Sequence, residues 1–212
     1  ALGGVRDFYK EAMNMVYDGA RDAQERVREI ADAIKGIIAV PHYEPTDFRE
    51  RAEAVVKVLS IVAERQGVTI DLSGLRDVGL IELDRKGIYN TIYNLINNAI
   101  PETPERGRIM VRCREIEYNG RPGVEIQVAD TGRGMPEHVR ERMFTDNAVS
   151  TKPGGTGLGT RIVKNVVEAH HGVIRVDSEA GQGTTFTICL PREQPRPEVE
   201  DGAEETGAGE GA

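Results

Sequence analysis

An aspartate placed directly after an apolar strand constrains the fold of this chain more than any other feature. Residues 124–128, Val-Glu-Ile-Gln-Val, have strong strand character and lead into residues 130–135, which contain Asp130, Gly132 and Gly134. A buried core does not require an aspartate there, because an unpaired carboxylate removed from water is costly. The glycines let the backbone approach a flat group closely. We therefore interpret this segment as one wall of a ligand site, with a ligand that donates a hydrogen bond to Asp130.

Two asparagines on a predicted helix are a second candidate wall. Asp84 is expected to cap this helix, whose apolar face consists of Ile88, Ile92, Leu95, Ile96 and Ala99. Asn94 and Asn98 are four residues apart, so both face one side of the helix beside the apolar stripe. They could simply lie on a solvated flank. Alternatively, Asn98 offers its carbonyl oxygen to Mg²⁺, a hard cation that prefers oxygen ligands and arrives with phosphates.

A glycine-rich loop precedes the helix predicted for residues 161–170. Residues 154–160 read Gly-Gly-Thr-Gly-Leu-Gly-Thr, and Ser150, Thr151 and Lys152 precede them with two hydroxyls and one cation. Backbone N–H groups in such a loop before a helix N-terminus favour phosphate. The composition predicts a lid over a ligand, although a glycine loop considered alone favours an ordinary mobile loop.

Two familiar phosphate motifs are excluded. A P-loop ends in Gly-Lys-Ser/Thr, whereas Gly159 is followed by Thr160 and Arg161. A dinucleotide fingerprint needs a third glycine three residues after the second, and past Gly134 that position is Glu137.

The N-terminal part of the chain is predicted to be helical. In residues 5–37, apolar side chains recur mostly at spacings of three and four, a stripe with too much apolar surface to lie alone. We predict a dimeric helical bundle, with a helix folded back on its own domain as the alternative. Prolines break the pattern at residues 41–45. Thr46 is then expected to cap a second helix that runs to about Arg65 and ends at Gly67.

The remainder of the chain alternates between strands and helices and ends in an acidic tail. Strands are predicted at residues 68–72, 78–83, 108–118, 124–128, 173–178 and 184–190, with a hairpin turn at Asn119 and Gly120. A short helix is expected from Pro136 to about Phe144. After Pro191 the composition changes to Glu, Gly, Ala and Pro, which predicts disorder because such a segment cannot bury enough apolar surface.

Composition narrows the class of protein. A formal net charge of −8 argues against non-specific nucleic-acid binding. No apolar run approaches the roughly 20 residues that span a bilayer, and no signal peptide is evident. Cys113 and Cys189 are isolated in strand-like runs, so free buried thiols are expected. These features predict a cytoplasmic chain without membrane contact of its own, which leaves open that it is the inner part of a larger membrane receptor.

In this order and spacing, residues 68–191 closely resemble the ATP-binding domain of sensor histidine kinases. That domain shares its Bergerat fold with DNA gyrase, a family of heat-shock chaperones and a mismatch-repair ATPase. Five segments carry the resemblance: residues 94–99 (the asparagine box), 130–135 (the first glycine box), Phe144 (the phenylalanine box), 155–159 (the second glycine box) and 181–186 (the closing strand signature).

The resemblance implies an α+β fold: a two-layer α/β sandwich with a mixed sheet and helices on one face, preceded by a helical dimerisation segment. It implies that Asp130 receives the adenine amino group, that Asn98 holds Mg²⁺ and that residues 145–159 close on the phosphates of ATP. The expected nucleotide-binding residues are Asn94, Asn98, Asp130, Gly132, Gly134, Met135, Phe144, Ser150, Thr151, Lys152, Gly155, Thr156, Gly157, Leu158, Gly159 and Thr184.

The implied organisation has three parts. Residues 1–65 would form part of a helical dimerisation and phosphotransfer segment, residues 66–191 the catalytic domain, and residues 192–212 a disordered acidic tail. The implied partners are a second copy of the chain, bound through the N-terminal helices, and a response regulator or a domain that carries the acceptor histidine.

Position 94 favours phosphoryl transfer over hydrolysis. Hydrolysing relatives usually have a glutamate there that activates water as a general base, and Asn94 cannot accept a proton at neutral pH. Transfer to a histidine supplied by another domain relies on positioning and charge neutralisation instead. One departure is that kinases often carry a cation and then an aromatic residue where this chain has Pro101 and Glu102. Lys152, Arg106 or Arg108 are candidate replacements for that cation.

No phosphoacceptor is evident among His42, His138, His170 and His171. Each is interpreted as a structural or surface histidine, so the acceptor is expected outside this sequence. Two other functions remain open: a nucleotide-sensing interaction module that transfers nothing, and a serine kinase of the anti-sigma type, which shares the fold.

Overall fold

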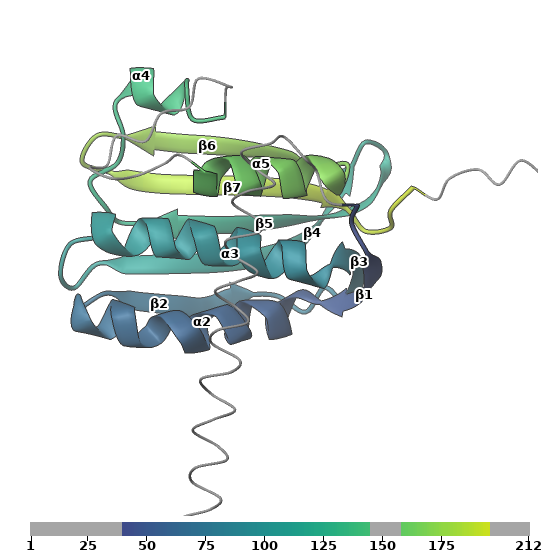
Figure 1. The fold of residues 1–212 in the computed structure, drawn as a ribbon, viewed down its shortest axis with the longest axis horizontal. Coiled ribbons are helices and arrows are strands. Elements are labelled where there is room, and N and C mark those ends of the chain that lie inside the picture. The colour runs from purple at the N-terminus through teal and green to yellow at the C-terminus, as the bar shows by residue number, and fades with distance from the viewer. Residues whose placement is uncertain (1–39, 145–157, 196–212) are drawn as a thin grey trace, which may run out of the picture.

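The computed structural model describes residues 40–144 and 158–195 (Figure 1). The elements in chain order are β1 (Tyr43–Asp47), α2 (Phe48–Arg65), β2 (Thr69–Leu75), β3 (Leu80–Asp84), α3 (Arg85–Ala99), the 3₁₀ turn η1 (Ile100–Glu102), β4 (Arg108–Tyr118), β5 (Arg121–Asp130), α4 (Glu137–Arg140), α5 (Leu158–Ala169), β6 (Val173–Glu179) and β7 (Gly183–Pro191).

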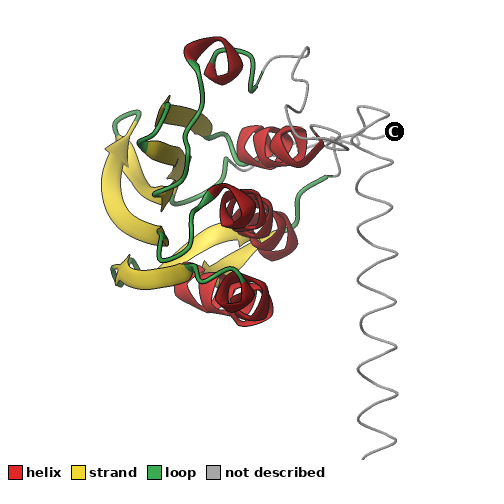
Figure 2. Cartoon of the chain, turned by 90° about the vertical axis from the view of Figure 1, so that its left-hand side faces the viewer, coloured by secondary structure: helices red, strands yellow, loops and turns green. Residues whose placement is uncertain are grey.

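Five strands form the main sheet in the order β2-β4-β5-β7-β6. Strand β2 is parallel to β4, and the other neighbours are antiparallel. Helices α2, α3 and α5 lie on one side of this sheet (Figure 2). The α+β class, the mixed sheet and the helices on one face are therefore confirmed.

The β4–β5 hairpin forms as the sequence predicts. Asn119 and Gly120 both have positive φ angles, 53° and 74°. Two consecutive left-handed residues match the right-handed twist of the flanking strands, and Asn-Gly is the dipeptide that adopts this turn most readily.

The core lies between the sheet and the helices. Helix α3 buries its predicted stripe, and the inward residues of β4, β5 and β7 complete the layer. The largest buried side chains include Ile88, Ile92, Leu95, Ile96, Ile109, Ile126 and Ile188. Burial of Cys113 raises the pKa of its thiol to about 12. Cys189 is only partly buried, and burial raises its pKa as well. Both cysteines are free, as expected, although full burial is wrong for Cys189.

The start of the second helix differs from the prediction. Asp47, not Thr46, is the N-cap, and its Oδ1 accepts a hydrogen bond of 2.8 Å from the Arg49 N–H. Thr46 is buried in β1, where it pairs with Ile81 of β3. The sequence did not predict this strand because it contains proline, which cannot donate a backbone hydrogen bond within a sheet. Proline is tolerated in edge strands, and β1 is an edge strand of a two-stranded sheet.

Helix α2 packs into the same core as the sheet. Phe48, Ala52, Val55, Leu59 and Ala63 are buried against α3 and β2. The expected division of the chain at residue 65 remains a prediction, but this helix, which lies on its N-terminal side, packs with the α/β part.

The first residues of the expected tail are held on the domain. Gln194 is 5% exposed, its Nε2 donates to the Glu82 carbonyl at 3.1 Å, and its N–H donates to Glu82 Oε2 at 2.8 Å. The Glu82 N–H donates to the Arg192 carbonyl at 2.9 Å. The expectation of disorder is therefore wrong for residues 192–195, because Arg192 and Gln194 form hydrogen bonds with Glu82 of β3. The expected helix over residues 5–37 and the tail beyond residue 195 lie outside the described residues.

Candidate functional site

A polar row crosses three strands at one end of the sheet. Asp130 of β5 pairs with Thr184 of β7, and Thr184 pairs with Ser178 of β6. Residues paired directly in antiparallel strands project to the same face of a sheet. The next row inward is apolar and consists of Val128, Phe186 and Val176. The polar row therefore closes the end of an otherwise apolar layer.

Backbone groups hold the Asp130 carboxylate in place. Its Oδ1 accepts hydrogen bonds from the Gly132 N–H at 2.8 Å and from the Thr184 N–H at 3.2 Å. Two donors on one oxygen fix the direction of the carboxylate at the end of β5. Asp130 and Thr184, separated by 54 positions in the sequence, are thus brought together as expected.

The first glycine segment leaves no room for side chains. A Cβ at Gly132 would lie 2.6 Å from Asp130 Oδ1 and from the Glu102 carbonyl, and one at Gly134 would lie 1.9 Å from the Glu179 carbonyl. Gly134 also has a φ of +63°, which L side chains rarely adopt. The segment is packed backbone to backbone against the β6–β7 turn, with the Gly181 N–H donating to the Arg133 carbonyl at 2.7 Å.

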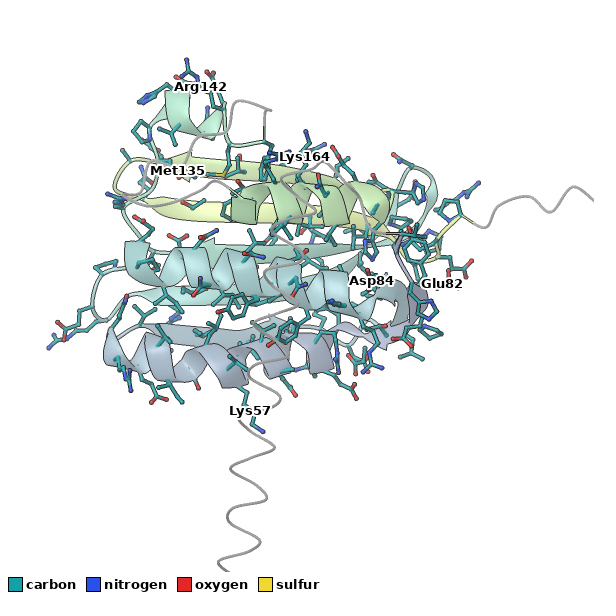
Figure 3. The ribbon with its side chains drawn as sticks, in the orientation of Figure 1. Lys57, Glu82, Asp84, Met135, Arg142 and Lys164 are labelled. Atoms are coloured by element: carbon teal, nitrogen blue, oxygen red, sulfur yellow. The ribbon has the colours of Figure 1, made fainter. Side chains whose placement is uncertain are left out.

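Ser178 is a site residue that the sequence pattern did not reveal. It is 9% exposed, and its Oγ accepts from the Met135 N–H at 2.9 Å. The sole sequence signal is a hydroxyl where the alternation of Ile174 and Val176 predicts an apolar side chain. Figure 3 shows Met135 at the end of the sheet opposite to Asp84 and Glu82.

The two asparagines of α3 lie beside the start of α5. A Cβ at Gly159 would be 3.1 Å from Asn94 Oδ1 and 3.5 Å from Asn98 Nδ2. The Asn94 amide also donates to the Asn90 carbonyl at 2.8 Å. Both asparagines are half-buried, whereas Asn97 between them is exposed. Asn94 and Asn98 therefore lie on a less exposed side of α3 than Asn97, and their role in a nucleotide site stays a prediction.

Phe144 packs on the apolar row that follows the polar row. Its ring contacts Phe186 edge to face with a centroid distance of 6.3 Å. Lys164 of α5 donates to the Phe144 carbonyl at 3.0 Å. These contacts tie the segment after α4 to the helix that follows the expected lid.

Several expected nucleotide-binding residues lie outside the described residues: Ser150, Thr151, Lys152, Gly155, Thr156 and Gly157. Leu158 is described only as the first residue of α5. Their roles stay predictions. Asn94, Asn98, Asp130, Gly132, Gly134, Met135, Phe144, Gly159 and Thr184 are described. The structure brings Asp130, Gly132 and Thr184 together in one group and Asn94, Asn98 and Gly159 in another.

Glu102 lies just after α3, in the region where the resemblance implied a cation. Its carboxylate pairs with Arg133, and its carbonyl accepts from the Arg133 N–H at 3.1 Å. Arg108, a candidate replacement cation, has its guanidinium 3.9 Å from the Asp71 carboxylate. Glu102 therefore braces the first glycine segment.

His170 is a structural histidine, as expected. It is 1% exposed, its Nε2 accepts from the Asp84 N–H at 2.9 Å, and its Nδ1 lies 2.6 Å from the Val166 carbonyl. These partners require the neutral form with the proton on Nδ1. Burial lowers the pKa of His170, and burial raises the pKa of Tyr43, whose ring packs edge to face on it. His42, His138 and His171 are exposed.

The side chains present fit a nucleotide with a divalent cation. Asp130 offers an acceptor to an amino group, and the Asn98 amide offers an oxygen ligand of the kind that Mg²⁺ prefers. Within the described ranges, no three His, Cys, Asp or Glu side chains gather as a metal cage. No helix of residues 40–144 and 158–195 is long and apolar enough to cross a bilayer.

Known proteins are similar to this chain in sequence and in fold. Residues 83–194, more than half of the chain, match the model of the family described as histidine kinase-, DNA gyrase B- and HSP90-like ATPases. Sensor protein DivL of Caulobacter vibrioides is 41% identical over 132 residues, which cover 62% of this chain and 16% of DivL. The chain spans less than half the length of such curated relatives.

Two solved structures have the same fold. Full-length ShkA in complex with AMPPNP has a TM-score of 0.68 and 24% identity, over 85% of this chain and 39% of ShkA. The histidine kinase ThkA in complex with response regulator protein TrrA has a TM-score of 0.62 and 21% identity, over 81% of this chain and 49% of ThkA. From the family match and the site geometry, this chain belongs to the histidine kinase-, DNA gyrase B- and HSP90-like ATPase family.

Proposed function

We propose that this chain is the ATP-binding catalytic part of a two-component sensor histidine kinase. It binds ATP with Mg²⁺ and transfers the γ-phosphoryl group to a histidine outside this sequence. One observation carries the proposal: the Asp130–Thr184 pair closes one wall of the site, while Gly159 at the start of α5 lies against Asn94 and Asn98 of α3.

Each side chain has a separate task in this proposal. Asp130 accepts a hydrogen bond from the adenine amino group, and its two backbone donors keep the carboxylate directed. The Asn98 amide oxygen would hold Mg²⁺, and the bound ion would supply positive charge to the phosphates. The N-terminus of α5 adds backbone N–H groups and a positive dipole end for phosphate. Phe144 and the expected lid exclude water from the site.

Asn94 supports transfer over hydrolysis. Its amide donates to Asn90 and lies against Gly159, and an amide has no basicity with which to activate water. A histidine nucleophile requires no such base from this domain, because in-line transfer depends on positioning and charge neutralisation.

Partners and location follow from this proposal. We infer that the phosphoryl group continues to a response regulator, by analogy with the complex of ThkA and response regulator protein TrrA. We propose a homodimer through the N-terminal helices, with the acceptor histidine outside this sequence. ATP and Mg²⁺ are abundant in the cytoplasm, which supports the expected cytoplasmic location.

Calorimetric titration with ATP tests the base contact. Asp130→Asn is expected to weaken binding by about 10- to 100-fold, the value of one hydrogen bond to a charged group. Asp177→Asn is the matched control, because this exposed carboxylate lies next to the polar row but on β6's other face. Equal ATP affinity of wild type and Asp130→Asn would refute the assignment.

A transfer assay tests the chemistry. The chain is mixed with a separate acceptor-helix fragment and radiolabelled ATP. Acid-labile label on the fragment supports the histidine kinase, and acid-stable label on a protein target supports a serine kinase of the anti-sigma type.

The position of Glu102 favours a second candidate, a nucleotide-sensing module that transfers nothing. A carboxylate paired with Arg133 stands where related kinases often place a cation for phosphate. Tight ATP binding without labelling of any acceptor would support this module.

A further inference from the structure

The Ser178 hydroxyl joins three parts of the candidate site. Its Oγ lies 2.9 Å from the Met135 nitrogen, 2.9 Å from the Gly183 carbonyl oxygen and 3.1 Å from Thr184 Oγ1. Ser178 and Thr184 are each 9% exposed, so water cannot readily replace these partners. The hydroxyl is therefore the shared partner of the first glycine segment and the start of β7.

Proton counting fixes the direction of these hydrogen bonds. A serine hydroxyl has one proton to donate and two lone pairs that accept. The Met135 N–H can only donate, so it uses one lone pair of Ser178 Oγ. The Gly183 carbonyl can only accept, so it accepts the one hydrogen bond that the Ser178 hydroxyl can donate. The contact with Thr184 must then run from the Thr184 hydroxyl to the second lone pair of Ser178.

This direction determines what Thr184 offers to a ligand. The Thr184 hydroxyl uses its only hydrogen in the hydrogen bond to Ser178. Its oxygen can then only accept, so a ligand group that reaches Thr184 Oγ1 meets an acceptor. Thr184 also donates its backbone N–H to Asp130 Oδ1, which places both acceptors in one row. Two neighbouring acceptors favour an amino group and oppose a carbonyl oxygen, because an acceptor facing an acceptor leaves both groups unsatisfied.

We propose that Ser178 is a positioning residue that sets base selectivity by holding the Thr184 hydroxyl as an acceptor. This inference rests on the proposed nucleotide-binding function and assigns to Ser178 a role that involves no contact with the nucleotide. Ser178→Ala removes the oxygen that takes the Thr184 proton. The Thr184 hydroxyl can then turn its proton towards the ligand and satisfy a carbonyl oxygen.

Titration of the full chain with ATP and with inosine triphosphate tests the inference. The two purines differ at C6, which carries an amino group in adenine and a carbonyl in hypoxanthine, and at the adjacent N1, which is an acceptor in adenine and carries a proton in hypoxanthine. We define the selectivity ratio as the dissociation constant of inosine triphosphate divided by that of ATP. This ratio is expected to fall about tenfold in Ser178→Ala, which is the size of one buried hydrogen-bond mismatch. Ser178→Thr, which retains the hydroxyl, is expected to keep the wild-type ratio.

A double-variant cycle separates positioning from a purely structural role. In a Thr184→Val background no hydroxyl remains to be oriented, so Ser178→Ala is expected to leave the ratio unchanged there. If Ser178→Ala weakens both nucleotides equally in the wild-type background, Ser178 has only a structural role and the inference is wrong. Ser178→Cys, with a weakly accepting thiol, provides the same comparison if Ser178→Ala does not fold. A wild-type chain that binds neither nucleotide would overturn the proposed function as well.

Discussion

The backbone N–H of Asp84 donates a hydrogen bond of 2.9 Å to His170 Nε2, and this bond joins the N-cap of α3 to the residue that follows α5. Tyr43 completes the cluster, because its ring packs on His170 and its hydroxyl donates to the Ala169 carbonyl. The two helices that carry Asn98 and Gly159 at the site are therefore fastened to each other at the opposite end of the domain.

This cluster predicts a loss of stability in mild acid. Burial lowers the folded-state pKa of His170 below the unfolded value of about 6.5. The unfolded chain therefore binds more protons in mild acid, so the stabilisation is complete above about pH 6.5 and is lost as the pH falls towards the folded-state pKa. Among the described neighbours, Asp84 opposes this shift and His171 adds to it.

Urea denaturation between about pH 7.5 and pH 5, a range that brackets the ordinary histidine pKa, measures the effect. His170→Gln removes the titrating group and is expected to flatten the pH dependence of the free energy of unfolding. His138→Gln, at an exposed position on α4, should retain the wild-type slope. Identical slopes for wild type and His170→Gln would contradict the prediction.

Gly134→Ala is expected to destabilise the domain strongly. A Cβ at Gly134 would lie 1.9 Å from the Glu179 carbonyl, and its φ of +63° is already unfavourable for alanine. Gly120→Ala is the matched control, because Gly120 has a φ of +74° and nothing within 4 Å of its Cβ position. The control should lose about 1 kcal/mol from backbone strain alone, and Gly134→Ala should lose substantially more in the same denaturation experiment. Equal losses would show that the close approach has no energetic consequence.

Asn98→Ala is expected to abolish the increase in ATP affinity that Mg²⁺ produces, because the amide oxygen is the proposed protein ligand of the ion. Titrations with and without Mg²⁺ measure this increase. Asn97→Ala on the same helix provides the comparison, since Asn97 is exposed and Asn98 is half-buried. A Mg²⁺ effect that persists in Asn98→Ala would place the ion elsewhere.

Truncation tests the role of residues 192–195. A chain that ends at Pro191 loses the hydrogen bonds of Arg192 and Gln194 to Leu80, Glu82 and Glu115. The expected cost is about 2–4 kcal/mol of unfolding free energy, at roughly 1 kcal/mol for each bond. A chain that ends at Pro195 retains these bonds and should be as stable as residues 1–212. Equal stability of the two truncated chains would show that the segment is dispensable.

The two thiols should differ in reactivity. Burial leaves Cys113 1% exposed and raises its pKa to about 12, so almost no thiolate forms near neutral pH. Alkylation followed by mass spectrometry should modify Cys189 slowly in the folded chain and Cys113 only in urea. Rapid modification of Cys113 without denaturant would contradict its burial.

Local signals in the sequence were sufficient for most of the elements. The stripe of α3, the Asn119–Gly120 hairpin and the capping Asp84 each depend on a few neighbouring residues, so their structure could be predicted without long-range information. Strand β1 could not, because Pro45 opposes strand formation locally and only pairing with β3 compensates for it. The ordered conformation of residues 192–195 could not be predicted for the same reason. Their hydrogen-bond partners Leu80 and Glu82 lie 112 positions earlier in the chain.

The sequence by itself determined the chemistry available to this protein: a carboxylate after a strand, two amides on one helix face, and glycines where the backbone must come close. Only the tertiary structure decided which of these groups meet. Strand register places Asp130, Thr184 and Ser178 in one row, and helix packing brings Gly159 against Asn94 and Asn98. The physical reason is that residue type fixes which hydrogen bonds a group can make, whereas the partner across a sheet or between helices depends on how distant segments pack.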